Sequence, residues 1–411
     1  MPMKIMVVVG ARPNFMKAAP IVSAIKQHNQ ESRAQELDAI LPVLVHTGQH
    51  YSASMSDTFF EDLKLSPPDV DLGVGSGSHA DQTAEIMKRF EAVLLGEAPD
   101  ALVVVGDVNS TIACTLVAAK ISLDSKGTRP LIAHVEAGLR SFDRSMPEEI
   151  NRVLTDHISD LLFATEESAL ENLANEGIPQ QKVHFVGNTM IDSLLACRER
   201  SKSSTILDRL DLAQGTKDDD SRCPTTRYAL LTLHRPANVD DRDAFLNILD
   251  GLDGVLKDHV VIFPVHPRTQ KRIAEFGLND RFETGTDHRA GAIRLTEPLG
   301  YLDFMCLMAN ATLVITDSGG IQEETTCLGV PCVTVRENTE RPSTLKTGTN
   351  MLAGVTTSGI RSAISRQLES PVKGGVPQLW DGKAAVRIVD VLRRQCLEKQ
   401  GIESGTEAVR A

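Results

Sequence analysis

The sequence has no CxxC pair, no GxGxxG motif and no apolar run long enough to cross a membrane. Its seven cysteines are scattered and odd in number. They therefore indicate neither a zinc site nor a disulfide framework, and they fit a reducing compartment. Without a glycine-rich fingerprint after the first apolar run, the chain also lacks the usual signature of a dinucleotide site.

An excess of positive charge is absent as well. The chain has 43 Lys and Arg residues against 55 Asp and Glu residues, a formal net charge of −12. This balance disfavours nucleic acid or an anionic membrane as the main partner. It does not disfavour a small anionic ligand, because a few cations in a cleft can outweigh the global field. The first ten residues lack a signal-peptide pattern, and we expect a buried strand there and a cytoplasmic protein.

What the sequence does contain is a recurring pattern of short Val-, Ile- and Leu-rich runs, each followed by a turn and a helical segment. Such continuous runs are typical of strands buried on both faces of a parallel sheet, and their alternation with helices predicts a doubly wound α/β fold. The expected strands cover 5–9, 41–45, 102–105, 131–135, 161–163, 228–233, 260–265, 311–315 and 330–335, and the expected helices include 16–27, 111–121, 190–200 and 384–399.

The 411 residues are enough for two domains, and the pattern changes after residue 187. We expect a Rossmann-like domain over 1–190, onto which the helix at 384–399 packs back. A connecting helix and an exposed polar linker follow over 191–226, then a second Rossmann-like domain over 227–383, and the tail from 401 is expected to fray. Open α/β sheets bind ligands at the carboxyl ends of their strands, so the side chains that follow the strands are the candidates for a site between the domains.

In the first half, Arg12 and Lys17 flank the turn after the first strand. Two cations at the start of a helix suit an anion, although a solvated turn with ordinary surface charges is the alternative. Asp107 follows the run at 102–105. It either caps the next helix, as Asn109 or Ser110 could, or takes part in catalysis.

Two further acids stand out in the first half. Glu136 ends the run at 131–135, where a buried carboxylate is costly unless it is paired or used, and His134 and Arg140 are its candidate partners. Glu148 lies in a helix start with Pro147 near the first position. Acids are common at helix starts, so a purely local role is the alternative for Glu148.

In the second half, His234 with Arg235 and His266 with Arg268 each follow a strand. A single histidine of this kind is more often a structural hydrogen-bonding group than a catalyst. The repeated arrangement favours the wall of an anion-binding cleft.

The strongest local signal is TDSGGIQEE at 316–324. Ser318, Gly319 and Gly320 offer a hydroxyl and unobstructed backbone N–H groups at a helix start, which suits a diphosphate. Glu324 could accept hydrogen bonds from ribose hydroxyls, and a tight turn with acidic capping is the alternative. Because the candidate acids all come from the first half, the pattern suggests a nucleotide-activated substrate whose reacting part faces the first domain.

The motifs GARPNFMKAAP, HTGQH, GDVNST, HVEAGLRSFD, MPEEINR, VGNTMID, LHRPAN, TDSGGIQEE and ERPST occur in this order. Together, over residues 3–395, they resemble the non-hydrolysing UDP-N-acetylglucosamine 2-epimerases. The resemblance implies a glycosyltransferase-B-type fold with the active site between two Rossmann-like domains. It also implies interconversion of UDP-N-acetylglucosamine and UDP-N-acetylmannosamine, no metal or nicotinamide cofactor, and a homodimer.

The resemblance further implies an elimination mechanism. UDP leaves C1 as the C2 proton is removed, giving 2-acetamidoglucal, and UDP adds back with reprotonation from the other face. This needs two acid/base groups and cations that stabilise the departing UDP. By motif matching, the catalytic residues would be Asp107, Glu136, Glu148 and His234, and the substrate-binding residues would be Arg12, Lys17, Arg140, His266, Arg268, Ser318, Gly319, Gly320, Glu324 and Arg341.

Some positions depart from the family's commonest pattern. Asn14 stands where Glu is frequent, and HRPAN replaces HRREN. The segment at 73–82 lacks the Arg of members activated by a second substrate molecule, which argues against such activation, although Gln49 and His50 remain. The GARPNF start also occurs in relatives that act on UDP-2,3-diacetamido-glucuronate. That 2-epimerase, a hydrolysing 2-epimerase, a glycosyltransferase and a non-catalytic sensor stay open as alternatives.

Overall fold

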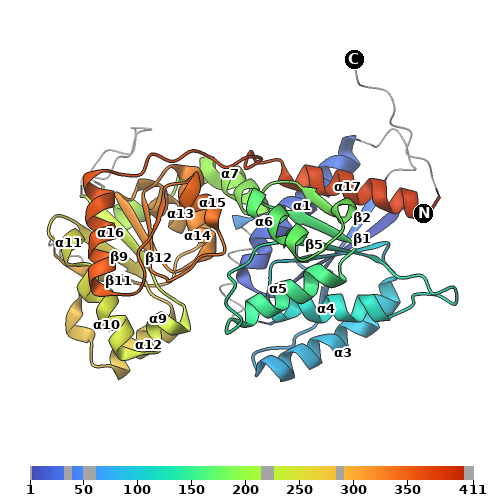
Figure 1. The fold of residues 1–411 in the computed structure, drawn as a ribbon, viewed down its shortest axis with the longest axis horizontal. Helices are drawn as coiled ribbons and strands as arrows, with labels where there is room; N and C mark the ends of the chain where they lie inside the picture. The colour runs from blue at the N-terminus through green and yellow to red at the C-terminus, as the bar shows by residue number, and fades with distance from the viewer. Residues whose placement is uncertain (1, 32–38, 50–61, 214–225, 284–290, 402–411) are drawn as a thin grey trace, which may run out of the picture. The chain divides into compact units, whose positions relative to one another are not determined.

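The computed structural model describes residues 2–31, 39–49, 62–213, 226–283 and 291–401. Within this part the chain forms two compact units (Figure 1). Unit 1 comprises the residues up to Ser193 and those from Gln378 onward, and unit 2 is Leu194–Pro377. The expected domain limits at 190 and 226 stay a prediction. Residues 214–225 of the expected linker and the tail from 402 lie outside the described residues.

Unit 1 is built on a parallel sheet with strand order β3-β2-β1-β4-β5-β6-β7, seven strands within the described residues. The strands are β1 (Met3–Val9), β2 (Ile40–His46), β3 (Val70–Asp71), β4 (Ala101–Val105), β5 (Leu131–Ala137), β6 (Leu161–Ala164) and β7 (Val183–Phe185), and the helices are α1 (Arg12–Glu31), α3 (His79–Glu97), α4 (Asn109–Lys120), α5 (Pro147–Ile158), α6 (Glu167–Asn175), α7 (Thr189–Ser201), which runs into unit 2, and α17 (Ala384–Lys399). The strand order reverses between β1 and β4, so the carboxyl ends of β1, β4 and β5 lie beside the topological switch point.

Both faces of this sheet are buried, which explains the continuous apolar runs. On one face, Ile5 and Val7 of β1 pack with apolar residues of α1 and α17. On the other face, Met6 and Val8 pack with apolar residues of α3 and α4. Figure 1 shows α17, from the end of the chain, lying beside α1 across the sheet from α3 and α4.

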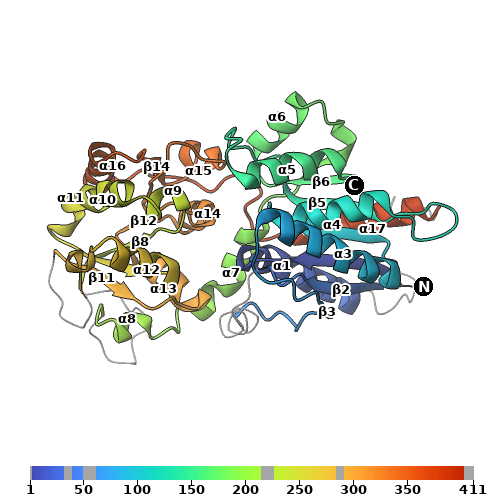
Figure 2. The same cartoon turned by 90° about the horizontal axis from the view of Figure 1, so that it is seen from below.

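Unit 2 repeats this architecture with strand order β10-β11-β9-β8-β12-β13-β14, again seven parallel strands within the described residues. The strands are β8 (Tyr228–Thr232), β9 (Val260–Pro264), β10 (Phe282–Glu283), β11 (Ile293–Thr296), β12 (Leu313–Thr316), β13 (Cys332–Thr334) and β14 (Asn350–Leu352), and the helices are α8 (Ile206–Arg209), α9 (Pro236–Val239), α10 (Arg242–Gly251), α11 (Asp253–Leu256), α12 (Pro267–Glu275), α13 (Tyr301–Asn310), α14 (Gly319–Leu328), α15 (Pro342–Lys346) and α16 (Thr357–Glu369). Figure 2 shows α10 and α16 on one side of β8 and β12, and α8 and α13 on the other.

The prediction of an exposed linker is wrong for its described N-terminal part. Ile206, Leu207 and Leu212 are buried in the core that includes Tyr228 of β8 and apolar residues of α13. Burial of three apolar side chains outweighs the polar composition of the segment, and α8 forms because it covers that face of the sheet.

The doubly wound, Rossmann-like prediction is confirmed for both units, since each of the nine expected runs coincides with most or all of a parallel strand. The strands that the sequence pattern missed are short or at the sheet edges, where few residues need to be apolar on both faces. Six of the seven cysteines lie in the described residues, where no disulfide joins any two of them, and Cys223 lies outside these residues. No described helix is both long and apolar enough to cross a membrane.

Candidate functional site

Glu136 occupies a strained position at the carboxyl end of β5. Its φ angle is +76°, in the left-handed region, and the pairing of β5 with β6 shifts register between Val135 and Ala137. A non-glycine residue in this region costs about 1–2 kcal/mol, and such strain gathers at functional sites. The carboxylate is buried and forms an ion pair with Lys17 of α1. The bulge therefore turns a carboxylate out of the sheet and towards a buried cation.

We expected His134 and Arg140 to be the partners of Glu136, and this prediction is wrong. Both instead contact Asp156 of α5, His134 through Nδ1 at 2.6 Å and Arg140 through Nη2 at 2.7 Å. Side chains alternate between the two faces of a strand, so His134 and Glu136 share a face, but the bulge at Glu136 changes the direction of its side chain. Lys17 was predicted only as a substrate-binding cation.

The backbone at Gly106 comes close to the Lys17–Glu136 pair and helps to place it. Gly106, after β4, has φ +69°, and a Cβ there would lie 2.9 Å from Lys17 Nζ and 3.4 Å from Glu136 Oε2. Asn14 holds the first turn of α1 by accepting from the N–H groups of Gly10 and Ala11 and donating to Val105 O, each at 3.0 Å. The amide of Asn14 thus ties α1 to both β1 and β4, which places Lys17 over the ends of the strands.

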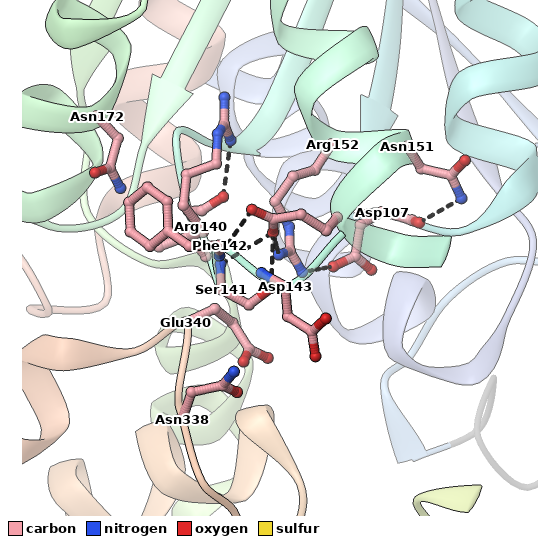
Figure 3. A network of polar contacts seen from close by, with 12 residues as sticks. Asp107, Arg140, Ser141, Phe142, Asp143, Asn151, Arg152, Asn172, Asn338 and Glu340 are labelled. Carbon is pink, nitrogen blue, oxygen red and sulfur yellow. Dashed lines mark hydrogen bonds and ion pairs between the residues drawn. The ribbon is translucent and has the colours of Figure 1, made fainter. Parts of the chain in front are cut away.

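Asp107 does not cap α4. The capping position is Val108, which makes no side-chain capping hydrogen bond. Asp107 Oδ2 instead lies 2.5 Å from Nη2 of the buried Arg152, and Asn151 Nδ2 donates to Asp107 O at 2.9 Å. Figure 3 shows Asn151 and Arg152 converging on Asp107 from α5. Two residues of one helix therefore orient Asp107 while its side chain stays partly exposed.

The adjacent acids Glu148 and Glu149 have different surroundings. Glu149 is buried and accepts from the N–H groups of Ser141 and Phe142, both at 3.0 Å, and from Arg152. These bonds fix the loop between β5 and α5. Glu149 is therefore a structural acid, and its charge is offset by four donors, including the hydroxyl of Ser141.

Glu148 is half-buried and makes no hydrogen bond or ion pair with the residues that the structure describes. It lies three and four residues before Asn151 and Arg152 in α5, so all three residues share one face of the helix. Because Asn151 and Arg152 both contact Asp107, this face points towards the end of β4. Glu148 therefore lies near Asp107, and its carboxylate has no structural partner among the described residues.

Arg140, expected to bind substrate, is used inside unit 1. Its side chain is 1% exposed and its guanidinium contacts Asp156 and Glu176 as well as Leu139 O. Burial raises the pKa of Asp156, but the charges and hydrogen bonds of His134 and Arg140 outweigh this and lower it. We therefore leave Arg140 out of the proposed binding residues, because it has little surface to offer a ligand.

In unit 2, Asp317 follows β12 and is fully buried. It accepts from the backbone N–H groups of His234 and Arg235, from Asn238 Nδ2 and from His234 Nδ1. The ring of His234 is about half exposed at the end of β8. The carboxylate of Asp317 therefore organises the turn that presents His234.

The second His–Arg pair has mainly local partners. His266 caps α12 by accepting from the N–H of Arg268 at 3.3 Å, and Arg268 forms an ion pair with Asp240. Both residues are exposed at the end of β9. Their expected contact with a substrate stays a prediction.

The SGG sequence begins α14 directly after β12, with Ser318 at the capping position and Gly319 and Gly320 in the first turn. Ser318 makes no side-chain capping bond, so its hydroxyl does not occupy the helix start. A Cβ at Gly319 would lie 2.8 Å from Glu340 Oε1, so a larger residue does not fit there. Glycine at position 319 therefore leaves room for the side chain of Glu340 beside the start of α14, where the first N–H groups have no partner within the helix.

Further along α14, Glu324 is buried and its Oε1 accepts from the hydroxyl of Tyr301 at 2.9 Å. Burial raises the pKa of Glu324 to about 7, although the bond from Tyr301 lowers it in part. The neighbouring Glu323 forms an ion pair with Arg341 at 2.7 Å. Of the two adjacent acids, Glu323 is paired with a cation and Glu324 with a neutral hydroxyl.

The raised pKa of Glu324 makes stability depend on pH in a defined direction. Between about pH 4.5 and 7 the folded chain keeps a proton that the unfolded chain loses, so the free energy of unfolding falls as the pH rises. A shift from 4.5 to about 7 corresponds to about 3 kcal/mol. We expect urea denaturation to show that Glu324→Gln gains stability relative to the wild type between about pH 5 and pH 8. An unchanged difference between the two proteins at these pH values would contradict the assignment.

The structure thus groups the predicted residues into two sets, one in each unit. Lys17, Asp107, Glu136 and Glu148 gather at the ends of β1, β4 and β5, and His234, Ser318, Gly319 and Gly320 gather at the ends of β8 and β12. Arg12 begins α1, but its side chain and all of His50 lie outside what the structure describes. Gln49 accepts from Ser110 at 2.8 Å. No three His, Cys, Asp or Glu side chains in the described ranges come together as a metal site would require.

Sequence reasoning missed four supporting residues, namely Asn14, Arg152, Asp156 and Asp317. All four are buried polar residues, and Asn14, Arg152 and Asp317 lie within motifs that were singled out for other residues, whereas Asp156 lies outside them. A polar residue next to a candidate site residue was the available signal. Its partner could not be deduced, because each contact joins residues from different elements of the fold.

A family model described as UDP-N-acetylglucosamine 2-epimerase matches residues 32–393. A UDP-N-acetylglucosamine 2-epimerase of Methanocaldococcus jannaschii is 42% identical over 392 residues, which cover 95% of this chain and 99% of the relative. A crystal structure of Methanocaldococcus jannaschii UDP-GlcNAc 2-epimerase in complex with UDP-GlcNAc and UDP has a TM-score of 0.81 at 41% identity, over 95% of this chain and 99% of that one. A UDP-2,3-diacetamido-2,3-dideoxy-D-glucuronate 2-epimerase of Pseudomonas aeruginosa is 36% identical, over 95% of this chain and all of the relative.

Proposed function

Because the chain belongs to the UDP-N-acetylglucosamine 2-epimerase family, we propose that it interconverts UDP-N-acetylglucosamine and UDP-N-acetylmannosamine. The observation that carries this proposal is the set of three carboxylates in unit 1. Asp107 and Glu136 each face a buried cation, and Glu148 has no partner among the described residues. Inversion at C2 needs more than one acid/base group, and unit 1 supplies three carboxylates, after β4, at the end of β5 and in the first turn of α5.

We propose that the reaction proceeds by elimination and re-addition. A carboxylate takes the C2 proton, the C1–O bond breaks, and its electron pair leaves with UDP, which gives 2-acetamidoglucal. UDP then attacks C1 again while a carboxylic acid delivers a proton to the other face of C2. The three acids have different surroundings, because Asp107 and Glu136 each face a cation and Glu148 does not, and we assign the acid and base roles of this reaction to them.

In the same proposal, unit 2 holds the nucleotide. Ser318, Gly319 and Gly320 bind the diphosphate at the start of α14, Glu324 accepts from the ribose, and His234 stands beside the leaving phosphate. Arg12, His266, Arg268 and Arg341 are the further residues that we propose to bind the substrate. Lys17 holds Glu136 and faces the sugar. The homodimer implied by the family is part of this proposal.

The proposal is tested by NMR of UDP-N-acetylglucosamine with the enzyme in heavy water. We expect the C2 epimer to form and deuterium to appear at C2 of both sugars, with no added cofactor. Absence of both exchange and epimer overturns the proposal. Steady release of UDP with free N-acetylmannosamine would instead identify a hydrolysing enzyme.

A second candidate substrate is UDP-2,3-diacetamido-2,3-dideoxy-D-glucuronate, which the 36% identity to the Pseudomonas aeruginosa enzyme favours. This sugar carries a carboxylate at C6, so its enzyme needs an additional cation in the sugar site. Parallel assays with the two UDP-sugars, comparing kcat/KM, decide between them. A higher value for the uronate would change the substrate and keep the reaction type.

A further inference from the structure

The carboxylate of Asp317 is surrounded by hydrogen-bond donors. It is fully buried at the end of β12, and its Oδ1 lies 2.8 Å from His234 Nδ1. Its Oδ2 accepts from the N–H groups of His234 and Arg235 at 3.0 and 2.9 Å and from Asn238 Nδ2 at 3.1 Å. These contacts tie the strand end that precedes the SGG turn to the turn that carries His234.

This environment decides which ring nitrogen of His234 carries a proton. Burial raises the pKa of Asp317, but the contacts with the His234 ring and the two backbone N–H groups outweigh it and lower the pKa below the ordinary value. An ionised carboxylate only accepts, so Nδ1 of His234 is the N–H that donates to it. Nε2 is then the nitrogen left to contact a ligand, and the side chain is 54% exposed.

We infer that Asp317 is a positioning residue for the proposed reaction, because it holds the ring of His234 with Nε2 directed at the departing diphosphate. The inference rests on the proposed function of the unit 2 site. When the C1–O bond breaks, negative charge develops on the diphosphate. When the ring carries a second proton, at Nε2, this nitrogen donates a hydrogen bond to the diphosphate, and the buried carboxylate behind the ring stabilises the positive charge of the imidazolium.

The position of Asp317 in the sequence supports this role. It directly precedes Ser318, Gly319 and Gly320, so one strand end carries both the groups proposed to bind the diphosphate and the group that orients His234. Groups behind a functional histidine that fix its tautomer typically contribute 10–100-fold to affinity or activity, by analogy with metal-bound histidines. The same carboxylate also builds the local turn, so a test has to separate orientation of the ring from support of the backbone.

A double-mutant cycle separates orientation of the His234 ring from support of the backbone. We expect Asp317→Asn alone to lower kcat/KM by about 10–100-fold. In a His234→Gln background we expect the same change to lower it by about twofold at most, because Asp317 acts through the ring. An equal loss in both backgrounds would overturn the inference, since it would show that Asp317 acts independently of His234.

Asn238→Ala is the matched control, because Asn238 donates to the same carboxylate and to Val335 O and makes no hydrogen bond to the ring among the described residues. Its effect is expected to be of similar size in the wild-type and His234→Gln backgrounds. A cycle in which Asn238→Ala depends on His234 as strongly as Asp317→Asn does would show support of the turn alone, and would overturn the inference.

A measurement without turnover separates this inference from the proposed function. Nitrogen-15 NMR of the wild type, assigned with His234→Gln, is expected to show His234 protonated at Nδ1. A ring protonated only at Nε2 would overturn the inference. If the wild type does not epimerise any UDP-sugar, the proposed function fails, while the NMR result still reports on the Asp317–His234 contact.

Discussion

Glu148→Gln is expected to fold like the wild type and to lose about 10²–10⁴-fold in kcat, the usual contribution of a group that transfers a proton in the transition state. Glu148 is half-buried, and its carboxylate makes no hydrogen bond or ion pair with the described residues that the fold would lose. Loss of the carboxylate therefore removes chemistry and leaves structure in place. Deuterium incorporation at C2 in heavy water measures the proton transfer directly, and urea denaturation measures the stability.

The neighbouring Glu149→Gln is the matched control, because it makes the same chemical change one residue further along α5. Glu149 accepts from the backbone of Ser141 and Phe142 and from Arg152 inside unit 1. Its neutralisation is expected to cost about 3 kcal/mol of the free energy of unfolding, the lower end for breaking a buried ion pair. If Glu148→Gln retained C2 exchange, or if Glu149→Gln were as stable as the wild type, the division of roles between the two acids would be wrong.

Lys17→Met is expected to destabilise the chain and to abolish epimerisation. The substitution keeps an unbranched side chain of similar length but removes the buried cation that faces Glu136. Breaking a buried ion pair by removing one partner costs about 3–5 kcal/mol, because the remaining charge stays desolvated. The free energy of unfolding in urea and the rate of C2 exchange are the two measurements.

The double variant Lys17→Met with Glu136→Gln separates stability from chemistry. With both charges gone, most of the lost stability is expected to return, since replacing a whole buried ion pair is often close to neutral. Activity is expected to stay absent, because Glu136 is a proposed acid/base group. A double variant as unstable as Lys17→Met would show that packing of the lysine, and not charge compensation, explains the effect.

Local pattern was sufficient for the fold class. Runs such as 102–105 and 131–135 are apolar at every position because both faces of the sheet are covered, and this requirement leaves a visible mark on the sequence. A short element such as α8 has too few residues to show a recognisable hydrophobic pattern in the sequence. Ile206 and Leu207 of α8 are buried only because they pack against the face of the unit 2 sheet that carries Tyr228.

The candidate site divides in the same way. Asp107, Glu136 and Ser318 could be singled out because they directly follow apolar runs, and strands of a parallel sheet end at one edge. Which cation faces which acid could not be predicted. Lys17 is 119 residues from Glu136 in the sequence, and Arg152 is 45 residues from Asp107.

By itself, the sequence determined two Rossmann-like halves, the strand ends that carry polar groups, and membership of a family that acts on UDP-sugars, because these depend on local periodicity and on the order of motifs. Tertiary structure alone decided that Glu136 turns out of β5 at a bulge to meet Lys17, that Glu148 stays without a described partner while Glu149 is structural, and that Asp317 stands behind His234. The physical reason is that charge pairing and burial are properties of neighbours in space. Those neighbours come from elements that only the packed sheets bring together.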